Sequence, residues 1–130
     1  MGIKNRNMTF NGEQLSAIVH LAKCMAAADG KVLPKELTVI ANELARFGVF
    51  GNATDAILTA SDAMNGAQSI AIVSAMNSEQ KKYVCAYLGS LMAIDGDIDD
   101  NEMQLWSLTT ALCDLPEMNA AQALQYMANL

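Results

Sequence analysis

The amino-acid sequence predicts an all-α fold, a single compact bundle of about seven helices. Three observations support this prediction. Apolar residues recur at three- and four-residue spacing, and no segment shows the strict alternation that marks a β-strand. Short polar residues repeatedly precede Gln or Glu by three positions, which is the pattern of a helix capping box. A helix–loop–helix pattern also occurs twice with one fixed offset, which indicates an internal repeat.

The length of 130 residues is typical of one domain. We expect residues 1–10 to form a flexible N-terminal segment and residues 11–130 to form a single domain. Within it, residues 11–48 and 77–114 are predicted to be two helix–loop–helix repeats related by a pseudo-twofold axis.

Start and stop signals place the individual helices. Capping-box pairs are Asn11 with Gln14, Asn65 with Gln68, Asp99 with Glu102, and Asn119 with Gln122, and Asn77-Ser78-Glu79-Gln80 offers another helix start. Pro34 suits the first turn of a helix, Gly48 and Gly51 bracket a turn, and Pro116 interrupts the chain. The predicted helices span about 12–28, 34–47, 53–64, 66–76, 78–94, 100–113 and 120–129.

The apolar stripes of the helices predict the core. The first helix carries Leu15, Ile18, Ala22 and Met25, the second Leu37, Ile40, Ala41 and Leu44, and the fifth Val84, Tyr87, Leu88 and Leu91. Subtracting 66 from the positions in the fifth helix gives apolar positions in the first (84 − 66 = 18). Met103, Trp106 and Thr110 match Leu37, Ile40 and Leu44 in the same way.

The three cysteines are widely spaced in apolar helical stretches. We therefore predict that Cys24, Cys85 and Cys113 are small buried side chains in a reducing compartment. His20, the only histidine, precedes Cys24 by four residues and is the one candidate partner for thiol catalysis. Because both lie in an apolar helix, we favour core packing over a catalytic dyad and expect a protein that is not an enzyme.

The net charge of −6 bears on the class of partner. Nucleic acid is not expected, because phosphate binding requires clustered Lys and Arg. An acidic chain is better suited to cations or to a basic protein partner. The sequence has no apolar run of the ~20 residues that a membrane span needs and no secretory signal. We therefore expect no membrane insertion and a cytoplasmic location.

The two repeated loops carry the candidate functional residues. Each contains Asp-Gly-x-(Val/Ile) with a Glu seven residues after the Asp, from Asp29 to Glu36 and from Asp95 to Glu102. This spacing matches the second half of an EF-hand calcium loop, in which a tight turn presents oxygen ligands. The positions two and four residues before each Asp are apolar, however, and this argues against a standard EF-hand.

The second loop is strongly acidic and has no neighbouring Lys or Arg. Repulsion among its carboxylates favours a bound divalent cation or a basic partner. If the two loops lie together, residues of the first would complete a shared site. The candidate metal ligands are Asp29, Glu36, Asp95, Asp97, Asp99 and Glu102. Because all are oxygen donors, Ca²⁺ or Mg²⁺ is a better match than Zn²⁺.

The same loops also suit a structural role. Gly30 and Gly96 fit the position just after a helix, where a left-handed residue is favoured. Asp99 and Glu102 fit a capping box, and acidic residues in general are favoured at a helix N-terminus. Without a metal, the acidic face could instead dock a basic or helical partner.

Two segments carry a family resemblance. Met25 to Val32 followed by Glu36, and Leu91 to Asp99 followed by Glu102, each show a helix ending in Asp-Gly-x-(Ile/Val) and a Glu on the next helix. They resemble the TerB-like tellurite-resistance domain, over roughly residues 11–116. The resemblance implies an all-α fold, a bacterial cytoplasmic setting and a role in stress or tellurite-resistance complexes. It also implies divalent-metal binding at the matching acidic positions, which are Asp29, Glu36, Asp95 and Glu102.

The sequence thus leads to two hypotheses. The first is a non-enzymatic acidic TerB-like module that binds a divalent cation through paired Asp-Gly loops within a stress-response assembly. The alternative is a metal-free interaction module that docks a basic or helical protein partner on the same acidic face.

Overall fold

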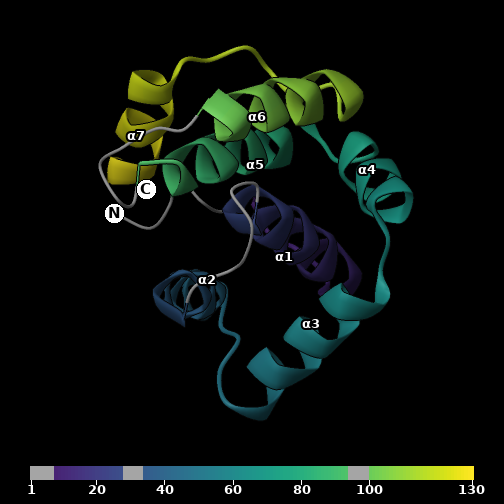
Figure 1. The fold of residues 1–130 in the computed structure, drawn as a ribbon. Helices are drawn as coiled ribbons and strands as arrows, with labels where there is room; N and C mark the ends of the chain where they lie inside the picture. Colours follow the sequence, from purple (N-terminus) through teal and green to yellow (C-terminus); the bar gives the residue numbers. More distant parts are fainter. Residues whose placement is uncertain (1–7, 28–33, 94–99) are drawn as a thin grey trace.

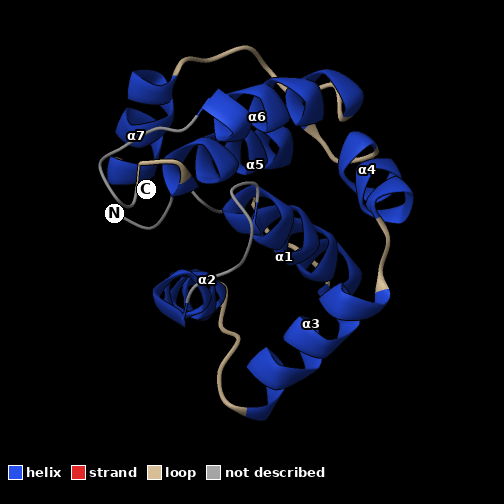
Figure 2. Cartoon of the chain, viewed as in Figure 1, coloured by secondary structure: helices blue, strands red, loops and turns tan. Residues whose placement is uncertain are grey.

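The computed structural model describes residues 8–27, 34–93 and 100–130. These ranges contain seven α-helices and no strand, so the predicted all-α fold is confirmed (Figures 1 and 2). The helices are α1 (Gly12–Ala26), α2 (Pro34–Arg46), α3 (Asn52–Ala63), α4 (Gly66–Ser74), α5 (Ser78–Leu91), α6 (Asp100–Leu112) and α7 (Ala120–Ala128). Each predicted boundary lies within three residues of the observed one.

Capping boxes begin four of the helices: three were predicted as such, and the fourth is at Asn77, which was predicted as a helix start. In each, the Asn side chain accepts a hydrogen bond from the Gln backbone N–H at 2.7–2.8 Å. The Gln side chain accepts one from the Asn backbone N–H at 2.8–3.0 Å. Two orphan donors of the first turn are thereby satisfied. The pair Asp99 and Glu102 cannot be assessed, because Asp99 lies outside the described residues.

Helix α1 lies at the centre of the bundle and packs against α2, α3, α4, α5 and α6 (Figure 1). The four apolar residues predicted to face inward from α1 are all buried, as are the four from α5. Helix α5 in turn packs most extensively against α7. The core is therefore built around the two helices that begin the predicted repeats.

Helices α2 and α6 confirm the core prediction only in part. Ile40, Leu44 and Trp106 are buried, but Leu37 is 39% exposed and its counterpart Met103 is 40% exposed. The prediction that Leu37 faces inward was wrong. It lies in the first turn of α2, and the buried residues of that helix are one and two turns further along, so only the later turns reach the core.

The helix positions carry the 66-residue offset of the sequence repeat. The starts of α1 and α5 differ by 78 − 12 = 66, and both ends of α2 and α6 differ by 66 (100 − 34 and 112 − 46). The turns that follow α2 and α6 also have the same backbone conformation at one position. Gly48 and Asp114, again 66 apart, both have positive φ, of 81° and 55°. The pseudo-twofold axis itself stays a prediction.

The packed part of the chain begins at Met8, three residues before the predicted start of the domain at residue 11. Met8 is buried, and the Thr9 carbonyl accepts a hydrogen bond from Gln80 Nε2 at 2.7 Å. The Phe10 ring lies 5.1 Å from that of Phe47, centroid to centroid. The packed domain therefore includes residues 8–10, which we had assigned to a flexible segment. Residues 1–7 lie outside the described part of the chain. None of the described helices is long and apolar enough to cross a membrane.

Candidate functional site

The structure describes two of the six predicted metal ligands. Glu36 and Glu102 are described, while the four aspartates, Asp29, Asp95, Asp97 and Asp99, lie outside the described residues. Within residues 8–27, 34–93 and 100–130, no group of three or more His, Cys, Asp or Glu side chains could hold a metal ion. A cation site of the predicted kind would therefore depend on the loop aspartates.

Glu36 and Glu102 occupy equivalent places in the fold. Each is the third residue of its helix, in the first turn of α2 and α6 respectively, and each is partly exposed. The partial positive charge of a helix N-terminus favours a carboxylate there. Both glutamates also interact with other groups of the protein. Their matched placement is therefore compatible with either a structural or a ligand-binding role.

The cysteine prediction is right for two residues and wrong for the third. Cys85 and Cys113 are buried, but Cys24 is exposed. Cys24 lies on the stripe of α1 that also carries Glu13 and His20, both of which are at least partly open to solvent. Although other helices surround α1 on most sides, this stripe stays open to solvent. Because the sequence of α1 is mainly apolar, the sequence pattern did not indicate the stripe.

His20 and Cys24 do not have the features of an activated dyad. His20 Nδ1 lies 2.9 Å from the Ser61 carbonyl oxygen, which can only accept, so this nitrogen carries the proton and donates. Partial burial raises the pKa of the Cys24 thiol. A nucleophilic cysteine needs a lowered pKa, because the thiolate is the reactive form. The geometry therefore gives no support to thiol catalysis at this pair.

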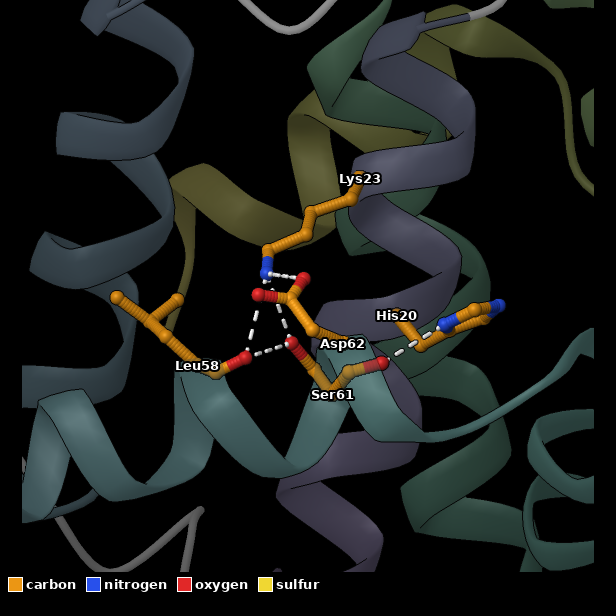
Figure 3. Close-up of polar contacts among 5 residues, drawn as sticks. All are labelled: His20, Lys23, Leu58, Ser61 and Asp62. Carbon is orange, nitrogen blue, oxygen red and sulfur yellow. Dashed lines mark hydrogen bonds and ion pairs between the residues drawn. The ribbon is translucent and has the colours of Figure 1, made fainter.

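A polar cluster that sequence analysis did not identify joins α1 to α3 (Figure 3). Lys23 Nζ donates to Asp62 Oδ1 at 2.7 Å, to Ser61 Oγ at 2.9 Å and to the Leu58 carbonyl at 3.3 Å. Ser61 Oγ donates in turn to the Leu58 carbonyl at 2.6 Å. The one signal in the sequence was a lysine within the apolar stretch of α1.

The pairing of Lys23 with Ser61 does not form a nucleophilic site. A lysine ammonium has three protons, and three acceptors surround Lys23 Nζ, so it is not placed to act as a base. Ser61 is 0% exposed, so no substrate can reach its hydroxyl group. The cluster instead fixes α3 against α1 through the buried part of the lysine.

A second cluster links α2 to α5. The Tyr83 hydroxyl group donates to Glu43 Oε2 at 2.5 Å, and Arg46 Nε donates to the same oxygen at 2.9 Å. Tyr83 stacks on Tyr87 with a centroid distance of 5.8 Å. Burial, followed by the charge of Glu43, raises the pKa of both tyrosines. Both hydroxyl groups therefore stay protonated near neutral pH, and the stacked rings pack in the core.

An open groove of about 760 Å³ lies between α6 and the start of α7. Its lining includes Met103 and Trp106 from α6, and Asp114, Glu117 and Met118 from the segment that leads to α7. Sequence analysis did not predict this groove, because it depends on the path of residues 113–119 between the two helices.

No protein-family model and no curated protein matches the chain. Among solved structures, it is similar to the crystal structure of the protein of unknown function PG1108 from Porphyromonas gingivalis W83. The two share 48% sequence identity with a TM-score of 0.81, over 95% of this chain and 99% of that chain. None of these comparisons tests the TerB-like resemblance, which stays a prediction. Identity of this extent over nearly the whole length means that the chain belongs to the same family as PG1108.

Proposed function

We propose that this protein is a non-enzymatic, cytoplasmic TerB-like module that binds a divalent cation through its Asp-Gly loops. In this proposal it acts in a bacterial stress or tellurite-resistance-type complex. The observation that carries the proposal is the equivalence of Glu36 and Glu102. Each is the third residue of a helix that directly follows an Asp-Gly loop, and the two helices begin 66 residues apart (100 − 34).

This placement supports a shared carboxylate site. Each repeat supplies one glutamate in the first turn of a helix and, seven residues before it in the sequence, an aspartate (36 − 29 and 102 − 95). Rigid glutamates combined with loop aspartates suit Ca²⁺ or Mg²⁺, which take several oxygen ligands at once. The net charge of −6 adds to the attraction for a cation.

A thermal melt of chelator-treated protein tests the proposal. It is repeated with millimolar Ca²⁺, Mg²⁺, Mn²⁺ or Zn²⁺. At one hundred times the dissociation constant, a bound cation should add about 2.7 kcal/mol to the free energy of unfolding. For a domain of this size, the melting temperature should rise on the order of 10 °C. The absence of a shift with all four ions would contradict cation binding.

Substitutions then locate the site. Glu36→Gln and Glu102→Gln should each reduce the cation-induced shift if the repeats share one site, and Asp95→Asn should abolish it. Only Glu102→Gln and Asp95→Asn should act if the second loop binds alone. Asp55→Asn is the matched control, because Asp55 is an exposed carboxylate in the first turn of α3, a helix outside the loops. Its cation-induced shift should equal that of the wild type.

The alternative is a metal-free interaction module that docks a basic or helical partner on the same acidic face. It is favoured by the exposed Asp100, which lies in the first turn of α6 two residues before Glu102. Partner capture that is lost in high salt and in Glu102→Gln, yet unchanged by chelator, would select this alternative.

A further inference from the structure

We propose that the groove between α6 and α7 binds a basic amphipathic segment of a partner protein. The proposal does not depend on cation binding, since the groove contains neither Glu36 nor Glu102. It rests on the shape of the groove, on the apolar part of its lining, and on the two carboxylates at its edge.

The groove has an apolar part with Trp106 at its centre, and uncharged polar residues complete the lining: Ser107, Thr110, Asn119 and Gln122. Trp106 is buried, and its indole Nε1 donates a hydrogen bond to the Cys85 carbonyl on α5 at 3.1 Å. Its ring also lies against Gly89, where a Cβ atom would approach Trp106 Cζ2 to 2.6 Å. Met103 and Met118 add to the apolar part of the lining. Flexible methionine side chains adapt to varied apolar partners.

The edge of the groove is acidic. Asp114 and Glu117 both line it and are exposed, the Asp114 side chain to 91%. Of the described residues that line the groove, none is Lys or Arg. The nearest ion pair joins Lys81 Nζ to Asp114 Oδ2 at 3.4 Å, with the Lys81 side chain 15% exposed and the Asp114 side chain 91% exposed. Because most of the Asp114 side chain is open to solvent, a cationic ligand can still reach this carboxylate as well as that of Glu117.

The backbone at Asp114 shows that this carboxylate is not needed for the turn. The Leu115 N–H bonds to the Thr110 carbonyl at 2.9 Å, and the Asp114 N–H bonds to the Ala111 carbonyl at 3.4 Å. These bonds form a Schellman motif with Asp114, at φ 55°, in its left-handed position.

The first repeat forms the same motif with a glycine. The Val49 N–H bonds to the Leu44 carbonyl at 3.2 Å, and Gly48, at φ 81°, takes the left-handed position. Glycine is the favoured residue there, because it has no Cβ. The second repeat instead keeps an aspartate at a conformationally less favourable position, on the edge of the groove. We take this difference as a sign that the carboxylate has a role outside the turn.

The dimensions indicate a peptide rather than a small ion. The α6 side of the groove runs from Met103 to Asp114, a separation of 114 − 103 = 11 residues. At ~1.5 Å per residue this is about 16 Å, or roughly three turns of a docked helix. An amphipathic helix can place its apolar face on such a surface and its Lys or Arg side chains along the edge. A second copy of this chain is a poor occupant, because two chains of charge −6 repel each other.

Titration with designed peptides tests the proposal. The probe is a Leu/Lys amphipathic peptide of about twelve residues, enough for roughly three helical turns, and the control peptide replaces each Lys with Glu. Trp106 is the only tryptophan, so its fluorescence reports directly on the groove. We expect saturable binding of the Leu/Lys peptide with a change in Trp106 emission, and no binding of the Leu/Glu peptide. Absence of saturable binding by the Leu/Lys peptide would overturn the proposal.

Two pairs of variants separate the groove from general charge effects. Asp114→Asn with Glu117→Gln should weaken binding by about fivefold at low salt, as expected for the loss of two exposed ion pairs. Asn tolerates the left-handed conformation, so the turn should persist. The control, Glu13→Gln with Asp55→Asn, removes the same charge from exposed positions outside the groove. Equal weakening by both pairs would indicate non-specific attraction and overturn the proposal.

A blocking variant tests the location on α6. Ala111→Arg places a large cation inside the groove, and Leu112→Arg places the same side chain on the next residue, which is exposed but does not line the groove. We expect loss of peptide binding only for Ala111→Arg. If a small cation such as arginine amide binds as tightly as the peptide, the ligand is an organic cation and the proposal is overturned. If the wild type self-associates and Ala111→Arg abolishes this, the occupant of the groove is a second copy of the chain and the proposal is overturned.

Discussion

Asp114 occupies in the second repeat the left-handed position that Gly48 occupies in the first. Each residue follows its helix by two positions and has a positive φ. In both turns, the N–H of this residue and the N–H of the next residue donate to carbonyls in the last turn of the helix. The strain of a side chain at this position should be measurable. We expect Asp114→Gly to raise the free energy of unfolding by about 0.5–1 kcal/mol, because glycine adopts this conformation without cost.

Urea unfolding of Asp114→Gly and of the converse variant Gly48→Asp checks this prediction. Gly48→Asp should be less stable than the wild type by a similar amount, since no atom approaches within 4 Å of a Cβ at residue 48 and only the backbone is strained. A less stable Asp114→Gly would mean that the ion pair with Lys81 outweighs the backbone strain.

Gly89 allows α6 to approach α5. An added Cβ would lie 2.6 Å from Trp106 Cζ2 and 3.0 Å from Ala123 Cβ, both in rigid, buried side chains. We therefore expect Gly89→Ala to destabilise the fold by on the order of 1–2 kcal/mol, because overpacking outweighs the gain in helix propensity. The melting temperature should fall by roughly 4 °C per kcal/mol. Gly66→Ala is the control, since it meets nothing within 4 Å and should leave the melting temperature unchanged or slightly higher.

The two stacked tyrosines should respond differently to loss of their hydroxyl groups. Tyr83→Phe removes the hydrogen bond to Glu43 and leaves a largely buried carboxylate with Arg46 as its remaining partner. We expect a loss of about 1–2 kcal/mol in the free energy of unfolding. Tyr87 Oη is buried and has no hydrogen-bond partner in the part of the chain that the structure describes.

Tyr87→Phe should therefore be neutral or slightly stabilising. Chemical denaturation of both variants under one buffer condition gives the comparison. A small cavity of about 10 Å³, lined by Glu43 and both tyrosines, is at the lower limit for one water molecule. Destabilisation by Tyr87→Phe equal to that of Tyr83→Phe would show that a bound water satisfies the Tyr87 hydroxyl group.

Stability should fall at alkaline pH in part through Cys113. Burial raises the pKa of this thiol from 9.0 to about 11, although the charge of Lys81 partly opposes the shift. In the unfolded chain the thiol ionises near its ordinary value, so the protonated thiol contributes its full stabilisation below about pH 9. That contribution should be lost progressively as the pH rises from about 9 to 11.

Urea unfolding at a series of pH values between 7.5 and 11 measures this slope. Cys113→Ala should show a shallower decline than the wild type. Cys24→Ala is the control, because Cys24 is exposed and its removal should change the slope less. An unchanged slope in Cys113→Ala would assign the alkaline loss of stability to other groups, such as the buried tyrosines.

Local signals determined how much of the fold could be predicted. Asn65 and Gln68 mark the start of α4 by themselves, because a capping box involves only residues three apart. Burial of Leu37 and Cys24 was mispredicted, because the buried face of a helix depends on which neighbours cover it. The α6–α7 groove depends on contacts among distant segments and on the left-handed turn at Asp114, so no sequence pattern indicated it. For the predicted cation site, only Glu36 and Glu102 fall within the described residues.

The exposure of Cys24 makes the unmodified protein suitable for distance measurements. Of its three thiols, only this one is exposed, so a maleimide dye should attach at a single point on α1 without any engineered cysteine. The lone tryptophan, Trp106 on α6, can then serve as a fluorescence donor to that acceptor. The wild-type chain thus provides its own energy-transfer pair. The donor is Trp106, which lines the groove, and the acceptor is the dye on Cys24 in the central helix.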